Sequence, residues 1–310
     1  ESAPGLRAAV EAALNEIVRL ESQISSFVPC SEISRANRDA ARQPVRVSPN
    51  VFTLLERAQS LVQESNGLFD PTIGPLLRCW RAADRLGSEP SADELQQALQ
   101  KTGMDKVELC KAKRTVRFAV PGMALDMGGI GKGWAIDCAA ELLRENGIQA
   151  GFLHGGTSSA HGFGRPPDSP SWKVAVLDPR LVDDPARPAT GFLTTVELQD
   201  ASLGISARRD VGVKAEPANR TYVLNPRAGS PVSDSLLAAV LTRSATDADA
   251  LSTALLAGGT HALEQLAACR PDSLLLLAVP ASGDHRPQLL CRGQSQTGQE
   301  PAQEGISQHT

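Results

Sequence analysis

The densest cluster of glycines lies at residues 126–134, which read Asp-Met-Gly-Gly-Ile-Gly-Lys-Gly-Trp. Glycine lets a backbone approach a ligand closely, and the helix predicted to follow over about 132–146 presents an N-terminus that favours an anion such as a pyrophosphate. A strand is expected just before the loop, near Met123–Leu125. The loop has neither the Walker A spacing nor GxGxxG. It is therefore either a phosphate-binding turn or a plain strand-to-helix turn with a solvated Lys132.

A second candidate site opens the helix predicted from about residue 247, in the segment Ala-Thr-Asp-Ala-Asp-Ala-Leu-Ser-Thr at 245–253. Asp249 and Thr253 are four residues apart, so their oxygens share one helix face and could hold a hard cation such as Mg²⁺ with a ligand's phosphates. Thr246 and Asp249 also have the T-x-x-D spacing of a capping box. Taken alone, the helix pattern favours capping.

The segment Gly-Gly-Thr-Ser-Ser at 155–159 follows a predicted strand that ends at His154. Backbone amides and hydroxyls therefore gather at a strand end, where ligands of α/β proteins commonly lie, although a plain turn explains the residues equally well. His154 and His161 have no partner at metal-ligand spacing. Because GxSxG and HExxH are absent, the sequence lacks the residues of a serine hydrolase of that type or a zinc protease.

The elements that must position these residues follow from hydrophobic periodicity. Apolar residues at three- and four-residue steps, together with capping signals, predict helices over about 6–24, 49–65, 92–102, 132–146, 247–257 and 261–269. Short apolar runs between turn residues predict a hairpin of 107–110 with 115–120, and further strands at 151–153, 172–177, 192–198, 221–224, 236–241 and 273–279. The Gln-, Gly- and Ser-rich residues 281–310 are expected to form a disordered tail.

Composition narrows the class of protein. The 310 residues carry 31 Lys+Arg and 35 Asp+Glu, a net charge of −4, so the chain lacks the electrostatic footprint of a nucleic-acid binder. No apolar run is long enough for a transmembrane helix, and no signal-peptide pattern opens the sequence, so we expect a mature or truncated soluble chain. The six cysteines form no CxxC pair and are interpreted as free thiols, which leans weakly towards a reducing compartment.

Taken in order, six segments resemble the FAD:protein FMN transferase family, also called the ApbE family. They read Ser-Glu-Ile-Ser-Arg-Ala-Asn at 31–37, Gly-Leu-Phe-Asp-Pro-Thr-Ile-Gly-Pro-Leu at 67–76, the loop at 126–134, His-Gly-Gly-Thr-Ser-Ser at 154–159, Asn-Pro-Arg-Ala-Gly-Ser-Pro at 225–231 and Ala-Asp-Ala-Leu-Ser-Thr-Ala at 248–254. Each segment is modest alone, but six in the family's order are specific.

The resemblance implies an α+β fold in which two intimately packed α/β lobes hold the flavin site between them, as a single domain over residues 1–280. A strand that the family places before its first helix is absent from this sequence, so one edge of the sheet is expected to be missing. The implied activity is Mg²⁺-dependent cleavage of the FAD pyrophosphate, transfer of FMN to a Thr or Ser hydroxyl of a target protein, and release of AMP. Some relatives instead hydrolyse FAD to FMN and AMP.

The resemblance also implies a set of site residues. The metal ligands would be the Gly131 carbonyl, Asp249, Thr253 and Ser252, and the catalytic residues Asp249 and Tyr222. The FAD contacts would be Asn37, Leu68, Phe69, Asp70, Gly128, Lys132, Trp134 and Val223.

Three residues depart from the family's His-x-x-Asp-Pro-Arg-Thr-Gly motif, because Tyr222, Asn225 and Ala228 stand where the family has His, Asp and Thr. Three hypotheses therefore stay open: a flavin transferase acting on a protein hydroxyl, an FAD pyrophosphatase, and an FAD-binding paralogue without turnover. The expected partners are FAD and an acceptor protein, with no nucleic acid. A cytoplasmic or periplasmic location is equally open, with a membrane anchor if a lipoprotein signal precedes the chain.

Overall fold

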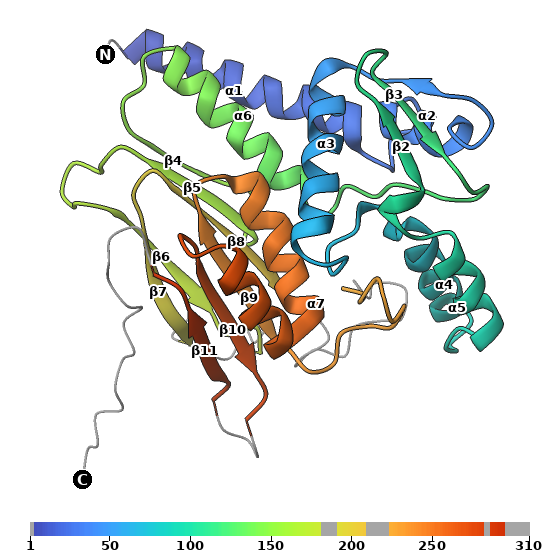
Figure 1. The fold of residues 1–310 in the computed structure, drawn as a ribbon. Helices are drawn as coiled ribbons and strands as arrows, with labels where there is room; N and C mark the ends of the chain where they lie inside the picture. The colour runs from blue at the N-terminus through green and yellow to red at the C-terminus, as the bar shows by residue number, and fades with distance from the viewer. Residues whose placement is uncertain (1–2, 181–190, 209–222, 282–285, 295–310) are drawn as a thin grey trace.

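The computed structural model describes residues 3–180, 191–208, 223–281 and 286–294. A six-stranded antiparallel sheet, in the order β11-β10-β9-β8-β5-β4, supports its C-terminal half (Figure 1). In chain order its strands are β4 (Gly151–His154), β5 (Ser159–Phe163), β8 (Ala201–Ala207), β9 (Leu237–Thr242), β10 (Leu274–Val279) and β11 (Gln288–Arg292).

Both faces of this sheet are covered. Helices α6 (Gly131–Glu145) and α7 (Ala245–Cys269) pack on one face, and the two-stranded ribbon β6 (Trp172–Leu177) and β7 (Phe192–Leu198) packs on the other (Figure 1). Successive residues of a strand point to opposite faces, so Leu275 joins the core under α7 while Leu276 joins the core under the ribbon. The nearly unbroken apolar run of β10 is explained by this double burial.

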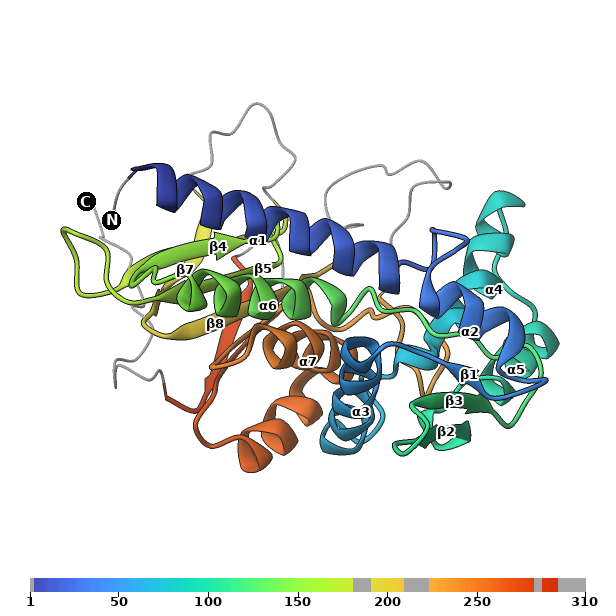
Figure 2. The same cartoon turned by 90° about the horizontal axis from the view of Figure 1, so that it is seen from above.

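The N-terminal half is mostly helical. Its helices are α1 (Ala3–Ile24), α2 (Glu32–Asp39), α3 (Pro49–Glu64), α4 (Gly74–Arg85) and α5 (Ala92–Gln100), with 3₁₀ turns at Pro71–Ile73 and Met104–Lys106. A small sheet adds β1 (Val45–Arg46), β3 (Thr115–Phe118) and β2 (Val107–Cys110), in that order. Figure 2 shows α6 lying between α1 and α7. One continuous core joins α3 and the small sheet to α7 and the large sheet, so the two halves pack intimately.

An ion-pair network fixes the start of α7 against α3. Arg57 donates two hydrogen bonds to Asp247, at 2.7 and 2.6 Å, and Arg270 lies 3.1 Å from the same carboxylate. Glu64 accepts from both arginines. A bidentate Arg–carboxylate pair holds both orientation and distance, so this network sets the position of the helix that carries Asp249.

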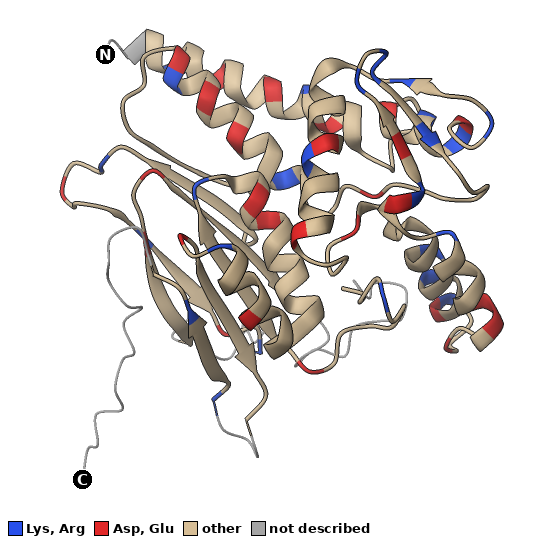
Figure 3. Ribbon diagram, in the orientation of Figure 1, with Lys and Arg blue, Asp and Glu red and all other residues tan. Residues whose placement is uncertain are grey.

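The structure confirms all the predicted helices but corrects several other predictions. Residues 123–125 do not form a strand. Of the predicted strand 221–224 only 223 and 224 are described, with Leu224 in an isolated bridge. The predicted tail is wrong for residues 288–292, because β11 pairs along β10; residues 295–310 lie outside the described part. None of the six cysteines, all of which lie in the described residues, forms a disulfide bond. No described helix is long and apolar enough to cross a bilayer, and Figure 3 shows charges of both signs interspersed.

A buried histidine links β5 to α6. His161 is 3 % exposed, and its Nε2 lies 2.9 Å from the Arg144 guanidinium while its Nδ1 lies 2.8 Å from Ser202 Oγ. Arginine can only donate, so Nε2 accepts and Nδ1 carries the hydrogen that is donated to Ser202. Burial, reinforced by the charge of Arg144, lowers the pKa of His161 from its ordinary value.

This geometry predicts a loss of stability at mildly acidic pH. The unfolded chain binds a proton at His161 more readily than the folded chain, so the free energy of unfolding should fall as the pH drops below about 6.5. In His161→Gln, which keeps an acceptor and a donor but does not titrate, the decrease between pH 7.5 and 5.5 should be smaller. The same change at the exposed His261 serves as control. Equal pH dependence of His161→Gln and the unmodified chain in denaturant titrations would contradict the assignment.

Candidate functional site

Asp249 is a buried carboxylate in the second turn of α7. It is 2 % exposed, its Oδ2 accepts a hydrogen bond from the Gly133 N–H at 3.1 Å, and its Oδ1 lies 3.4 Å from Lys132 Nζ. Burial raises the pKa of the Asp249 carboxyl above its usual value, while Lys132 and the Gly133 N–H act in the opposite direction. The Asp249 carboxylate is therefore held between the N-terminal turns of α6 and α7.

The structure excludes the capping interpretation of Asp249. The N-cap of α7 is Ser244, whose Oγ accepts from the Asp247 N–H at 3.2 Å. The hydroxyl of Thr246 donates instead to Asp137, at 2.6 Å. Thr246 and Asp249 thus have the spacing of a capping box, but their side chains bind other partners.

Asp137 of α6 holds the N-terminus of α7, a role that the sequence analysis missed. Its carboxylate accepts from the backbone N–H groups of Ala245 and Thr246, both at 2.8 Å, and from Ser244 Oγ at 2.7 Å. The negative charge also suits the positive end of the helix dipole. Asp137 lies four residues after Gly133 and so shares its helix face, but only the fold shows that this face meets α7.

Three hydroxyls gather one turn beyond Asp249. Ser252 Oγ and Thr253 Oγ1 each donate to the Asp249 carbonyl, at 2.9 and 3.1 Å. Ser206 of β8 lies 2.9 Å from Ser252 Oγ and 3.2 Å from Thr253 Oγ1. The sequence analysis did not single out Ser206. In β8, larger apolar residues alternate with Ser and Gly, and these small residues face α7.

The glycine loop lies directly against this cluster. A Cβ atom at Gly129 would be 3.2 Å from Thr253 Oγ1 and 3.4 Å from the Phe69 ring. Lys132 Nζ donates to the Gly128 carbonyl at 2.9 Å, which keeps the ammonium group over the loop. The structure therefore brings together three distant segments, which contribute Phe69, Gly128 with Lys132, and Asp249 with Thr253.

Several expected FAD contacts use their polar atoms inside the protein. Asn37 pairs with both backbone groups of Leu125, at 2.9 and 2.7 Å. Asp70 accepts from Thr72 and from the Met104 N–H, and Trp134 is 8 % exposed in the main core. These side chains position the loops around the site, so their direct contact with FAD stays a prediction.

Leu68, Val223 and Tyr222 were also expected at the site. Leu68 is buried against Gly258, and Val223 is half-buried. Tyr222 lies outside the described residues, so its role also stays a prediction.

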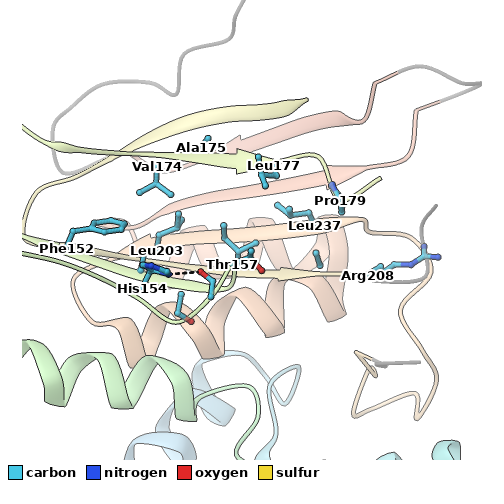
Figure 4. Close-up of a pocket in the computed structure, with 15 residues that line it drawn as sticks. Phe152, His154, Thr157, Val174, Ala175, Leu177, Pro179, Leu203, Arg208 and Leu237 are labelled. Atoms are coloured by element: carbon cyan, nitrogen blue, oxygen red, sulfur yellow. Dashed lines mark hydrogen bonds between the residues drawn. The ribbon is translucent and has the colours of Figure 1, made fainter. Parts of the chain in front are cut away.

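Two cavities flank the cluster. The ribbon cavity, about 480 Å³, lies between the β6–β7 ribbon and the large sheet, with Phe152 at one end and Arg208 at the other (Figure 4). Its walls are mostly apolar. The loop cavity, about 500 Å³, lies between the end of α1 and the start of α6, and is lined among others by Gly131 and Lys132. His154 lines both cavities, so they meet at the loop that follows β4.

Comparison with known proteins identifies the family. A model of the ApbE family matches residues 3–276. The chain belongs to the ApbE family. A relative named FAD:protein FMN transferase from Treponema pallidum is 28 % identical over 264 residues, which are 80 % of this chain and 71 % of the relative. One of the same name from Vibrio cholerae is 24 % identical over 258 residues, 82 % of this chain and 73 % of the relative.

Solved ApbE structures confirm the α+β fold. The ApbE protein of Thermotoga maritima superposes with a TM-score of 0.77 and 25 % identity, over 95 % of this chain and 92 % of that one. The flavin transferase ApbE of Vibrio cholerae gives a TM-score of 0.74 and 24 % identity, over 94 % and 89 %. The six sequence segments thus led to the right family.

Two glycines of the ApbE loop should respond differently to an added methyl group. Gly131 is helical and does not have positive φ, and its Cβ would meet only the end of the Ile24 side chain, at 2.7 Å. A Cβ at Gly133 would lie 2.0 Å from the Ala245 carbonyl oxygen, which is backbone and cannot rotate away.

We therefore expect Gly131→Ala to change the free energy of unfolding by about 1 kcal/mol or less, and Gly133→Ala to lower it by more than about 3 kcal/mol. Thermal unfolding of both variants measures the difference. A backbone-carbonyl ligand at residue 131 needs no glycine, so metal affinity of Gly131→Ala should be unchanged. Strong destabilisation by Gly131→Ala would contradict this geometry.

Proposed function

We propose that this ApbE member is a Mg²⁺-dependent transferase that moves FMN from FAD to a Thr or Ser hydroxyl of an acceptor protein and releases AMP. One observation carries the proposal: Asp249 and the hydroxyl cluster lie beside Lys132, which lines the loop cavity, and against β8, whose Ile205 and Ala207 line the ribbon cavity. The names of the relatives support the reaction class.

The donor set suits Mg²⁺ held jointly with a substrate. Asp249 supplies one carboxylate, Thr253 and Ser252 supply neutral hydroxyl oxygens, and the Gly131 carbonyl opens α6 nearby. No cluster of three or more His, Cys, Asp or Glu residues occurs in the described part of the chain. Mg²⁺ is commonly held by one or two carboxylates, substrate phosphates and water, so a single buried carboxylate fits a cation that arrives with a diphosphate.

The two cavities suit the shape of FAD, which carries two ring systems joined by a pyrophosphate. Ile205 and Ala207 line the ribbon cavity, and between them in β8 Ser206 points to the hydroxyl cluster on the other side of the sheet. Gly131 and Lys132 line the loop cavity, and Lys132 Nζ lies 3.4 Å from Asp249 Oδ1. We assign one ring system to each cavity, with the exposed Phe27 at the mouth of the loop cavity as an aromatic surface for stacking.

The protein's own groups would orient and polarise the pyrophosphate. Lys132 places a positive charge beside it, and the N-terminal end of the α6 dipole adds a partial positive charge. Bound Mg²⁺ would neutralise the charge that develops on the bridging oxygen during cleavage. The acceptor hydroxyl then forms the new P–O bond to FMN, its proton is released, and the bond to AMP breaks.

Asn225, one of the three departures from the family motif, has a structural role. Its Oδ1 accepts from the N–H groups of Arg227 and Ala228, at 3.0 and 3.1 Å, while its Nδ2 donates to the Ala257 carbonyl at 3.1 Å. An ionised Asp could not make the last bond. The departure from the family motif thus serves local structure, and does not by itself signal lost catalysis.

Incubation of the full chain with FAD, Mg²⁺ and a Thr-bearing acceptor protein tests the proposal. A gain of one FMN mass on the acceptor together with AMP release is the expected result. AMP and free FMN without labelling would indicate a pyrophosphatase, and bound FAD without either product would indicate a binding protein.

A further inference from the structure

A third cavity, of about 610 Å³, lies at a break in α7, and Leu68, one of the expected FAD contacts, is among its lining residues. It is bounded by the hairpin 223–232, the segment Ser233–Ser235 and the break at 257–261. None of its lining residues lines the ribbon or loop cavity. The Asn225–Pro231 segment singled out in the sequence therefore faces a space of its own.

The break exposes a helix N-terminus to this cavity. Gly259 has φ +59° and ψ −143°, so the helical hydrogen-bond ladder is interrupted and a new segment runs from Thr260 to Cys269. On the N-terminal side of the break, Asn225 Nδ2 donates a hydrogen bond to the Ala257 carbonyl oxygen. On the other side, the first N–H groups of the new segment lack the acceptors of a preceding turn and carry partial positive charge. Thr260 and His261, which open this segment, both line the cavity.

A buried hydroxyl independently points to a ligand. Ser235 is 1 % exposed and lines the cavity, and its Oγ has no hydrogen-bond partner among the described residues. A Cβ at Gly259 would lie 3.3 Å from this oxygen, so the hydroxyl faces the start of the new helical segment. Buried polar groups without a partner are rare and call for a specific explanation.

The side chains around the cavity favour an anion. The exposed Arg227 lines it, and its guanidinium group has no hydrogen bond or ion pair within the described residues. The imidazole of His261 is a second nitrogen-bearing side chain in the lining. Asp234 also lines the cavity, where its carboxylate accepts from Ser233 Oγ at 2.6 Å and keeps its negative charge. Arginine, a hydroxyl and helix N–H groups together provide donors from several directions, as a tetrahedral anion requires.

We propose that this cavity binds a phosphate group, either inorganic phosphate or a small phosphate ester, held by Arg227, Ser235 and the N-terminus at Thr260. The volume exceeds the needs of the phosphate alone and leaves room for an organic substituent. The proposal does not depend on FAD transfer, because Asp249 and Lys132 take no part in it.

Calorimetric titration of the full chain with orthophosphate, and separately with glycerol 3-phosphate, tests the site. Arg227→Gln and Ser235→Ala should each weaken binding, Arg227→Gln by about tenfold or more, because a charge-assisted hydrogen bond is lost. Arg42→Gln, at an exposed arginine elsewhere, is the matched control and should leave the affinity unchanged. Tighter binding of the ester than of orthophosphate would assign the cavity to an ester, and equal or weaker binding to inorganic phosphate.

The proposed pyrophosphate site is the competing location for phosphate, and Lys132→Gln separates the two. Unchanged phosphate affinity in Lys132→Gln, with weakened affinity in Arg227→Gln, supports the new site whether or not the chain turns over FAD. The proposal is overturned if no saturable binding is seen, or if Lys132→Gln abolishes binding while Arg227→Gln and Ser235→Ala do not affect it.

Discussion

Asp249→Asn is expected to lower the rate of AMP release from FAD by at least about 100-fold, with little loss of stability. The variant keeps the side-chain volume but removes the negative charge that would bind the cation, and loss of a metal ligand costs rate far more than folding. It also removes the free-energy cost of burying a charged carboxylate, a cost that is reflected in the raised pKa of Asp249. Initial rates at saturating FAD and Mg²⁺, with the melting temperature of the same sample, measure both effects.

Asp247→Asn is the matched control, because it makes the same chemical change two residues earlier in α7. Asp247 takes part in the ion pairs with Arg57 and Arg270 and has no contact with the hydroxyl cluster. We expect a loss of about 1–3 kcal/mol in the free energy of unfolding, with the rate per folded molecule retained. If Asp249→Asn kept its rate but melted at a lower temperature, Asp249 would be a structural residue only.

Tyr222→His is expected to raise turnover by about 10²- to 10⁴-fold, the range that a positioned histidine contributes in general acid–base catalysis. The expectation rests on the family motif, which has His at this position. An unperturbed tyrosine has a pKa of about 10 and is a poor base near neutrality. The measurement is the pH dependence of AMP release by both forms.

Tyr222→Phe serves as the control for Tyr222→His, because it removes the hydroxyl without supplying a base. It should not raise the rate. If Tyr222→His left both the rate and the FAD affinity unchanged, the residue at this position would not be a proton carrier in this chain.

The sequence allowed much of the fold to be predicted, because helices with caps leave local signals. The capping box at Ser91 and the proline after Ser48 both start helices as expected. Strands β5 and β8 were missed for a tertiary reason. A Cβ at Gly204 would lie 2.2 Å from the Ala248 carbonyl oxygen, so β8 uses small residues where α7 approaches, and such residues resemble a loop in sequence.

The residues of the candidate site could be predicted from the sequence only where they belong to a family motif. The local pattern around Asp249 favoured capping, and the resemblance alone assigned it to metal binding. Asp137 and Ser206 belong to elements whose contact with α7 depends on three-dimensional packing, so their partners could not be read from spacing along the chain. Asn37 shows the converse, because the motif assigns it to FAD while its amide pairs with the Leu125 backbone.

The most direct test of the central claim, that FAD and a divalent cation meet at Asp249, is the affinity for FAD measured with and without Mg²⁺. With one carboxylate in the site, the protein alone should bind Mg²⁺ weakly, whereas Mg²⁺ should tighten FAD binding by at least about tenfold, because each ligand supplies part of the other's site. Asp249→Asn should abolish that enhancement. An FAD affinity that is the same with and without Mg²⁺, or an enhancement that persists in Asp249→Asn, would contradict the account.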